Sequence, residues 1–199
     1  EAAHQVLTLA GCNNACDEPD GDFLTPDFAH MSPSSPHARP RLIYVDSPQD
    51  ALDRAVNEIS ALHHHAHLPL GSVLVLYGER INRVDLYRSL VRQLGGRHVW
   101  WLNEKSQRRA PAHGSSTQPL RMAYLDSATG LEAGVVFVLG AEKLLATLST
   151  DSPPEDDARK LYMAMTRAAA RLVLLSTQRL PAALERWFDQ PDLHSHAPA

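Results

Sequence analysis

Polar side chains that could bind a ligand gather in the first half of residues 126–138. One apolar run ends just before Asp126, a tight turn around Gly130 follows, and a second apolar run closes the segment. Ligands of open α/β sheets bind just beyond the carboxyl ends of strands. We therefore expect Asp126, Ser127 and Thr129 to line the rim of such a sheet.

Glu132, in the same segment, directly precedes the second apolar run. Burying an unpaired carboxylate is costly, so this side chain must be solvated or bonded to a partner. The sequence leaves open whether Glu132 is a solvated loop acid or a ligand contact.

A second segment whose side chains could take part in chemistry lies on a helix expected over residues 155–169. Tyr162, Met165 and Ala169 recur at helical spacing and are expected to face the sheet. Arg167 then lies near the helix C-terminus, where the helix dipole favours a cation. An arginine can also reach across an interface to transition-state phosphate charge, as arginine fingers do. Position alone does not separate these two roles.

The sequence has none of the usual glycine-rich phosphate loops. Neither GxxxxGK[ST], whose backbone N–H groups and lysine hold phosphates, nor GxGxxG is present. The pair Gly95 and Gly96 follows an amphipathic stretch and is expected to end a helix. By itself, the chain lacks the loop that usually binds the phosphates of a nucleotide.

Apolar runs alternate with amphipathic stretches from Arg41 onward. Ser47 and Pro48 are typical of a helix N-cap and first helical position. Such alternation predicts an α/β fold, a parallel sheet with helices on both faces. The expected strands are 41–45, 72–77, 97–102, 121–125, 134–139 and 171–176, and the expected helices are 1–10, 49–62, 84–94, 155–169 and 180–188.

Composition limits the classes of function. The 199 residues are 44% hydrophobic, enough for a real core, and carry a formal net charge of −4. Nucleic-acid binding would therefore rest on a local patch or on a partner domain. No apolar run approaches the roughly 20 residues of a membrane span. Cys12 and Cys16 are expected to be free thiols rather than metal ligands, and so few cysteines suit a reducing cytoplasm.

Two motifs, together and in order, resemble those of UvrD, Rep and PcrA-like superfamily 1 DNA helicases. Residues 162–168 (YMAMTRA) resemble helicase motif VI, Y-V-A-[LM]-T-R-A. Residues 124–138 (YLDSATGLEAGVVFV) resemble the preceding motif, T-[IV]-[HD]-S-x-K-G-L-E with its apolar strand. Residues 72–77 resemble the strand that opens the second RecA-like lobe of these enzymes. The resemblance covers most of the chain.

The resemblance implies a C-terminal RecA-like (P-loop NTPase-like) lobe that lacks its own P-loop. Residues 41–190 would form the lobe, after an N-terminal helix and irregular connection in 1–40 and before a disordered tail in 191–199. ATP and Mg²⁺ would be bound mainly by the N-terminal RecA-like lobe of a longer parent protein. The other partner would be single-stranded or partially duplex DNA. We expect the isolated chain not to hydrolyse ATP.

The resemblance also implies roles for five residues around the nucleotide. Arg167 would be an arginine finger to the γ-phosphate of ATP. Glu132 would contact the ribose, close to Gly130. Tyr162 and Thr166 would help to couple the nucleotide cleft to the DNA track.

On the DNA side, the resemblance places Asp126, Ser127 and Thr129 near single-stranded DNA phosphates. The chain departs from the family at three positions. Thr129 replaces a lysine, which removes one cationic contact, Ala133 replaces a large or aromatic residue, and Gly78 replaces a frequent arginine.

Three weaker signals have both a functional and a structural interpretation. The histidines of residues 63–67 are expected to be a solvated helix end rather than a metal site. Trp100 and Trp101 could stack on bases, or one could pack in the core while the other covers a sheet edge. Arg108 and Arg109 could touch phosphates or form a solvated pair.

Two rival functions remain open at this point. The chain could be a stand-alone relic of a helicase lobe that acts as a protein-interaction or regulatory module without ATPase activity. Net acidity and Thr129 favour that alternative. A flavodoxin-like regulator would need a phosphate site, and the sequence offers none.

Overall fold

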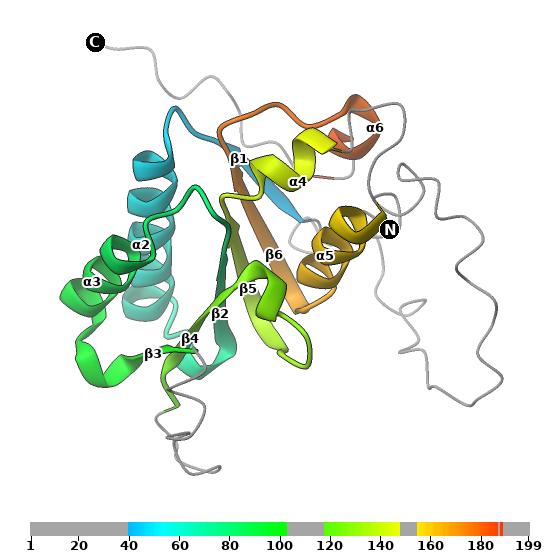
Figure 1. Ribbon diagram of the computed structural model, residues 1–199. Coiled ribbons are helices and arrows are strands. Elements are labelled where there is room, and N and C mark those ends of the chain that lie inside the picture. Colours follow the sequence, from blue (N-terminus) through cyan, green and yellow to red (C-terminus); the bar gives the residue numbers. More distant parts are fainter. Residues whose placement is uncertain (1–39, 103–117, 148–154, 187, 189–199) are drawn as a thin grey trace, which may run out of the picture.

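A computed structural model describes residues 40–102, 118–147, 155–186 and 188. Within these residues, six strands form one sheet in the order β1-β6-β5-β2-β4-β3, and every neighbouring pair is parallel (Figure 1). The strands are β1 (Arg41–Tyr44), β2 (Val73–Tyr77), β3 (Val99–Trp101), β4 (Leu120–Tyr124), β5 (Ala133–Leu139) and β6 (Ala168–Ser176).

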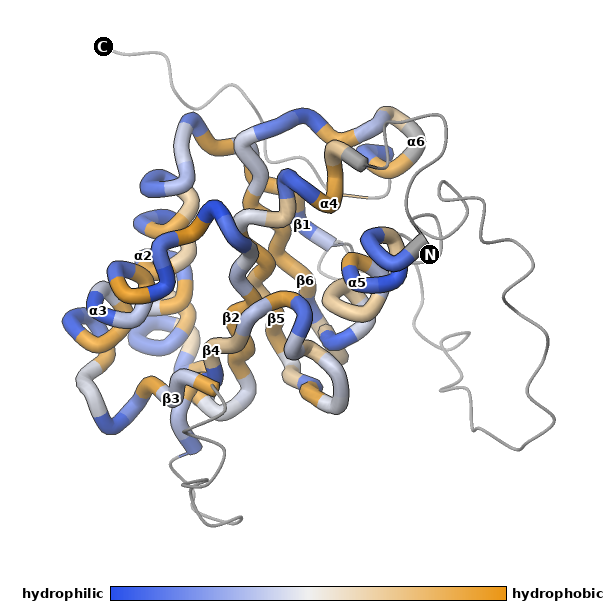
Figure 2. Tube along the Cα trace, viewed as in Figure 1, coloured by the Kyte–Doolittle hydropathy of each residue, from blue (hydrophilic) through white to orange (hydrophobic). Residues whose placement is uncertain are grey.

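Helices cover both faces of this sheet, which confirms the expected α/β fold of RecA-like type. α2 (Pro48–His65) and α3 (Arg83–Leu94) bury their apolar sides in one hydrophobic cluster. On the opposite face, α4 (Glu142–Thr147), α5 (Glu155–Met165) and α6 (Ala182–Glu185) contribute to a second cluster. Figure 2 shows the apolar strands between helices whose outer sides are hydrophilic.

The ends of α2 and α3 follow from their sequence. The side chain of Ser47 accepts a hydrogen bond from Asp50 N at 3.1 Å, and Pro48 takes the first helical position, as predicted. α2 continues to His65, three residues beyond the expected end. Gly95 ends α3 with a φ of 89°, a conformation that glycine adopts without steric cost.

α5 is shorter than predicted. It ends at Met165 instead of residue 169, because the chain enters β6 at Ala168, which pairs with Ala133 of β5. Ala169 is therefore an exposed strand residue, and its expected packing against the sheet is wrong. Met165 is buried as predicted, whereas Tyr162 is only half-buried. Helix α4 was not predicted at all.

A short crossover joins β4 to β5 over residues 125–132. It begins with a 3₁₀ turn, Leu125–Ser127, at the carboxyl end of β4, and it ends at the amino end of β5. Leu125 and Ala128 are buried in the same cluster as the inner side of α5, so the crossover lies on the α5 face. The crossover therefore carries polar side chains from the carboxyl ends of the strands, called here the carboxyl edge of the sheet, to their amino ends, called here the amino edge.

Several predictions fall outside the described residues. These are the helix at 1–10, both cysteines, Arg108, Arg109 and the tail at 191–199. Within the part of the chain that the structure describes, no helix is both long and apolar enough to cross a membrane.

Candidate functional site

The two segments singled out in the sequence meet at the amino ends of β5 and β6. The backbone N–H of Ala133 donates to the carbonyl of Arg167 at 3.1 Å. Earlier in the crossover, Thr129 Oγ1 lies 3.9 Å from Met163 Sδ on α5. The amino edge of the sheet thus brings together one set of predicted residues, called here the amino-edge site: Gly130, Glu132, Tyr162, Thr166 and Arg167.

The Arg167 guanidinium is bound to the end of its own helix. Its Nε donates to the carbonyl of Met163 at 3.0 Å, and its Nη2 donates to Thr166 Oγ1 at 3.3 Å. The Thr166 hydroxyl also donates to the Met163 carbonyl, at 3.0 Å. In this conformation Arg167 neutralises the carbonyl end of α5, as the helix-dipole interpretation requires. A guanidinium has more N–H donors than these two bonds use.

Glu132 and Gly130 are both exposed. The carbonyl of Glu132 accepts a hydrogen bond from the half-buried guanidinium of Arg121, whose pKa is lowered by burial. A Cβ added at Gly130 would meet no atom within 4 Å, so space would allow a side chain there. The backbone φ of 75°, which favours glycine, explains the residue instead. The Glu132 carboxylate is thus a solvated acid in this structure, beside an open turn.

The predicted rim residues are divided along the crossover. Asp126 and Ser127 are exposed at the carboxyl end of β4, as expected. Thr129, also exposed, lies further along and packs against α5 through Met163. Asp126 and Ser127 therefore lie at the expected rim, and Thr129 lies next along the crossover, beside α5.

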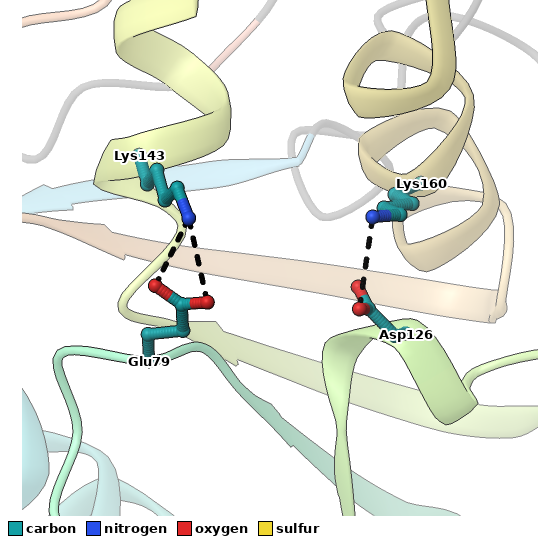
Figure 3. Close-up of polar contacts among 4 residues, drawn as sticks. All are labelled: Glu79, Asp126, Lys143 and Lys160. Atoms are coloured by element: carbon teal, nitrogen blue, oxygen red, sulfur yellow. Dashed lines mark hydrogen bonds and ion pairs between the residues drawn. The ribbon is translucent and has the colours of Figure 1, made fainter.

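At the carboxyl edge lie two ion pairs that the sequence did not predict, one of which contains Asp126. Lys160 of α5 lies 3.7 Å from the Asp126 carboxylate, and Lys143 of α4 lies 3.2 Å from that of Glu79, which follows β2 (Figure 3). Tyr124 lies near both acids: its pKa is raised by partial burial and then by the negative charges of Glu79 and Asp126. These five residues are called here the carboxyl-edge cluster.

No motif reveals this cluster in the sequence. Its lysines come from two helices and its acids from the ends of two strands, so only the sheet order brings them together. The sole available signal was that Glu79 and Asp126 each follow an apolar strand, where ligand sites of α/β sheets lie.

Glu142 fixes α4 at this edge. It is 1% exposed, and its Oε1 accepts hydrogen bonds from the backbone N–H and the hydroxyl of Thr177, at 3.0 and 3.1 Å. Its Oε2 is buried without a partner among the described residues. The next residue, Lys143, is thereby held facing Glu79.

Gly78 occupies the position where the resembling family often has an arginine. Its N–H donates to the carbonyl of Leu139 at 2.8 Å, and a Cβ added there would lie 2.0 Å from the carbonyl oxygen of Gly140. Close approach of two backbones at the ends of β2 and β5 therefore excludes any side chain at Gly78.

The weaker signals have structural explanations. His63 Nδ1 lies 3.0 Å from the carbonyl of Leu68, and the described residues contain no group of three or more potential metal-binding side chains. Trp101 packs against the α2 and α3 cluster, and its Nε1 donates to the hydroxyl of Tyr77 at 2.8 Å. Trp100 is half-buried on the edge strand β3.

Comparison with known proteins finds similarity among solved structures. No protein-family model matches the chain, and no curated protein matches it. Among solved structures, the chain is similar to the C-terminal domain of a possible DNA helicase from Lactobacillus plantarum WCFS1. The match has 17% sequence identity and a TM-score of 0.50, and it covers 74% of this chain and 80% of the other. The two chains share a fold. At this identity the likeness extends to the fold of a helicase C-terminal domain and no further.

Proposed function

We propose that this chain is the C-terminal motor lobe of an ATP-dependent DNA helicase or translocase of the UvrD/Rep/PcrA type. Arg167 would act as the arginine finger in the ATP site. The observation that carries the proposal is the meeting of the two motif-bearing segments at one edge of the sheet, through the hydrogen bond from Ala133 to Arg167. The shared fold with a helicase C-terminal domain agrees with it.

The amino-edge site suits a nucleotide whose phosphates are held elsewhere. Among the described residues, partners take up only part of the N–H donors of Arg167. Glu132 offers an exposed carboxylate that can accept from a ribose hydroxyl, and the turn at Gly130 is open. None of these groups replaces a P-loop. ATP and Mg²⁺ would be bound mainly by a first lobe, where the metal neutralises phosphate charge.

Lobe closure would give Arg167 its catalytic role. Its present hydrogen bonds, to Met163 and Thr166, are part-buried or exposed, so each contributes only about 1 kcal/mol. Exchanging them for bonds to a phosphate is favourable, because the acceptor is then an anion in place of a neutral carbonyl or hydroxyl. The guanidinium would then stabilise charge that develops on the transferred phosphoryl group.

DNA-stimulated ATP hydrolysis by the two-lobe protein tests this function. Arg167→Ala should lower the rate about 10³-fold while nucleotide binding is largely kept. Arg167→Lys retains a cation at the helix end, so a rate that stays low in this variant separates the finger from the helix-dipole role. Arg159→Ala, an exposed position on the same helix, is the matched control and should retain the rate.

A regulatory or protein-interaction module is the second candidate function. It is favoured by one specific observation, that Arg167 is engaged with the end of its own helix. An ATPase rate unchanged by Arg167→Ala would support this module and contradict the motor.

A further inference from the structure

Thr129 stands where the resembling helicases have a lysine, so the turn itself offers no cation to a phosphate. A cation is nevertheless present next to this turn. Thr129 packs against Met163 of α5, and Lys160 precedes Met163 by three residues. Residues three apart on a helix share a face, and Lys160 lies 3.7 Å from Asp126 at the start of the same crossover. Helix α5 thus presents a lysine to the segment that lacks one.

Lys143 supplies a second cation at this edge. Its ammonium lies 3.2 and 3.4 Å from the two carboxylate oxygens of Glu79, and these side chains are 65% and 60% exposed. The side chains of Lys160 and Asp126 are 39% and 48% exposed. Glu79 and Asp126 each stand two residues beyond the paired ends of β2 and β4, so the two pairs belong to one surface (Figure 3). Each lysine is therefore accessible to a polyanion.

Both ion pairs are weak enough to exchange. Solvent-exposed ion pairs contribute roughly 0 to 1 kcal/mol, because water screens the attraction and two long side chains lose freedom. A nucleic-acid phosphate can replace a carboxylate at little cost, and counterions released from the strand add a favourable entropy. The displaced acids stay close and repel the strand.

We propose that Lys143 and Lys160 are phosphate contacts for single-stranded DNA, and that Glu79 and Asp126 are counter-charges which the strand must displace. Lys160 takes the place of the lysine that Thr129 replaces. The inference rests on the proposed DNA-translocating function and names contacts for it. It assigns Asp126 an opposing role, in place of a direct contact with DNA.

The test is binding of a fluorescent oligodeoxythymidine to the full chain, followed by anisotropy over a series of low salt concentrations. Lys160→Ala should weaken binding about 5-fold and reduce the slope of log affinity against log salt by about 0.7, the value for one phosphate contact on a single strand. Lys143→Ala should have the same effects on the affinity and on the salt slope. Arg159→Ala, next to Lys160 and exposed, should change affinity less than twofold.

Two further variants test the mechanism itself. Asp126→Asn removes a counter-charge and should tighten binding about 3-fold, an effect opposite to that expected for a DNA contact. Thr129→Lys, added to Lys160→Ala, should restore affinity, because it returns a cation to the same crossover.

The outcomes separate this inference from the function on which it rests. Wild-type binding that responds to Lys160 and Asp126 as stated supports it. Binding that neither lysine substitution affects overturns the inference alone and leaves the DNA-binding function intact. No binding by the wild-type chain, even at the lowest salt, also overturns the inference, because the two lysines then give this chain no affinity for a strand. The ATPase test of Arg167 is independent of all three results.

Discussion

The two edges of the sheet hold their cations in different ways. At the amino edge, Arg167 is bound to a backbone carbonyl of α5 and to the hydroxyl of Thr166, just after that helix. At the carboxyl edge, Lys143 and Lys160 are each paired with a carboxylate. A guanidinium that is bound only to neutral acceptors can still bind an anion that another surface brings to it. A group that is already paired with an acid can only exchange one anion for another.

This difference suits two kinds of partner. Transition-state charge on a phosphoryl group arises at one point and for a short time, and one guanidinium with spare donors matches it. A DNA strand presents a row of phosphates, and spaced lysines with exchangeable counter-charges allow it to bind and move on. The crossover of residues 125–132 joins the two edges, so it is the segment through which one could influence the other.

The functions of the two edges should be separable by mutation. In the two-lobe protein, Arg167→Ala should reduce ATP hydrolysis about 10³-fold and change DNA affinity less than twofold. The double variant Lys143→Ala, Lys160→Ala should weaken DNA binding and leave hydrolysis at saturating DNA within about twofold. Rate and affinity would be measured on the same preparations. If Arg167→Ala weakened DNA binding strongly, the two edges would form one site.

The next largest effect concerns stability at the carboxyl edge. Gly78→Ala places a methyl group 2.0 Å from the carbonyl oxygen of Gly140, and neither backbone can retreat without disturbing β2 or β5. We expect a loss of about 3 kcal/mol in the free energy of unfolding, measured by urea denaturation. Gly96→Ala, whose Cβ would have its nearest neighbour at 3.8 Å, is the control and should change stability by less than about 1 kcal/mol. Equal losses in both variants would remove the steric explanation.

A smaller effect is expected at the amino edge. Gly130→Ala meets no atom within 4 Å, so its cost comes only from forcing alanine into a φ of 75°. That cost is about 1 kcal/mol, clearly less than at Gly78. Urea denaturation of both variants under the same conditions compares crowding with backbone strain. A Gly130→Ala variant as unstable as Gly78→Ala would mean that the turn is packed more tightly than the structure shows.

The fold was predictable because its signals are local. Continuous apolar strands, the Ser47 cap and the glycine after α3 each specify an element without reference to distant residues. The end of α5 was not predictable in the same way. Residues 166–169 fit a helix by composition, but Ala168 pairs with Ala133, so β6 begins there and residues 166 and 167 form the turn before it. Tertiary pairing overrode local preference there.

The same distinction applies to the candidate sites. The amino-edge site lies within two continuous motifs, so its residues could be named from sequence. The carboxyl-edge cluster joins residues as distant as Glu79 and Lys160, and β2 comes to lie between β5 and β4 only in the folded sheet. Without an expected strand order, no sequence pattern links them. Gly78 similarly gains its explanation only from the position of Gly140.

The smallest effect concerns how the stability of the protein depends on pH. The pKa of Tyr44, at the end of β1, is raised to about 12 by burial and then by its hydrogen bond to Glu185. The raised pKa lies above the unfolded value of about 10, so the associated stability is complete below pH about 10 and is lost as pH rises toward about 12. The ionised hydroxyl can no longer donate to Glu185 and is repelled by it.

Urea denaturation at several pH values from about 9 to about 12 measures this loss, with Tyr44→Phe as the comparison. The variant should be less stable than the wild type at pH 9, because it lacks the hydrogen bond, and the difference should shrink toward pH 12. Parallel curves for wild type and variant would show that Tyr44 does not link its protonation to folding.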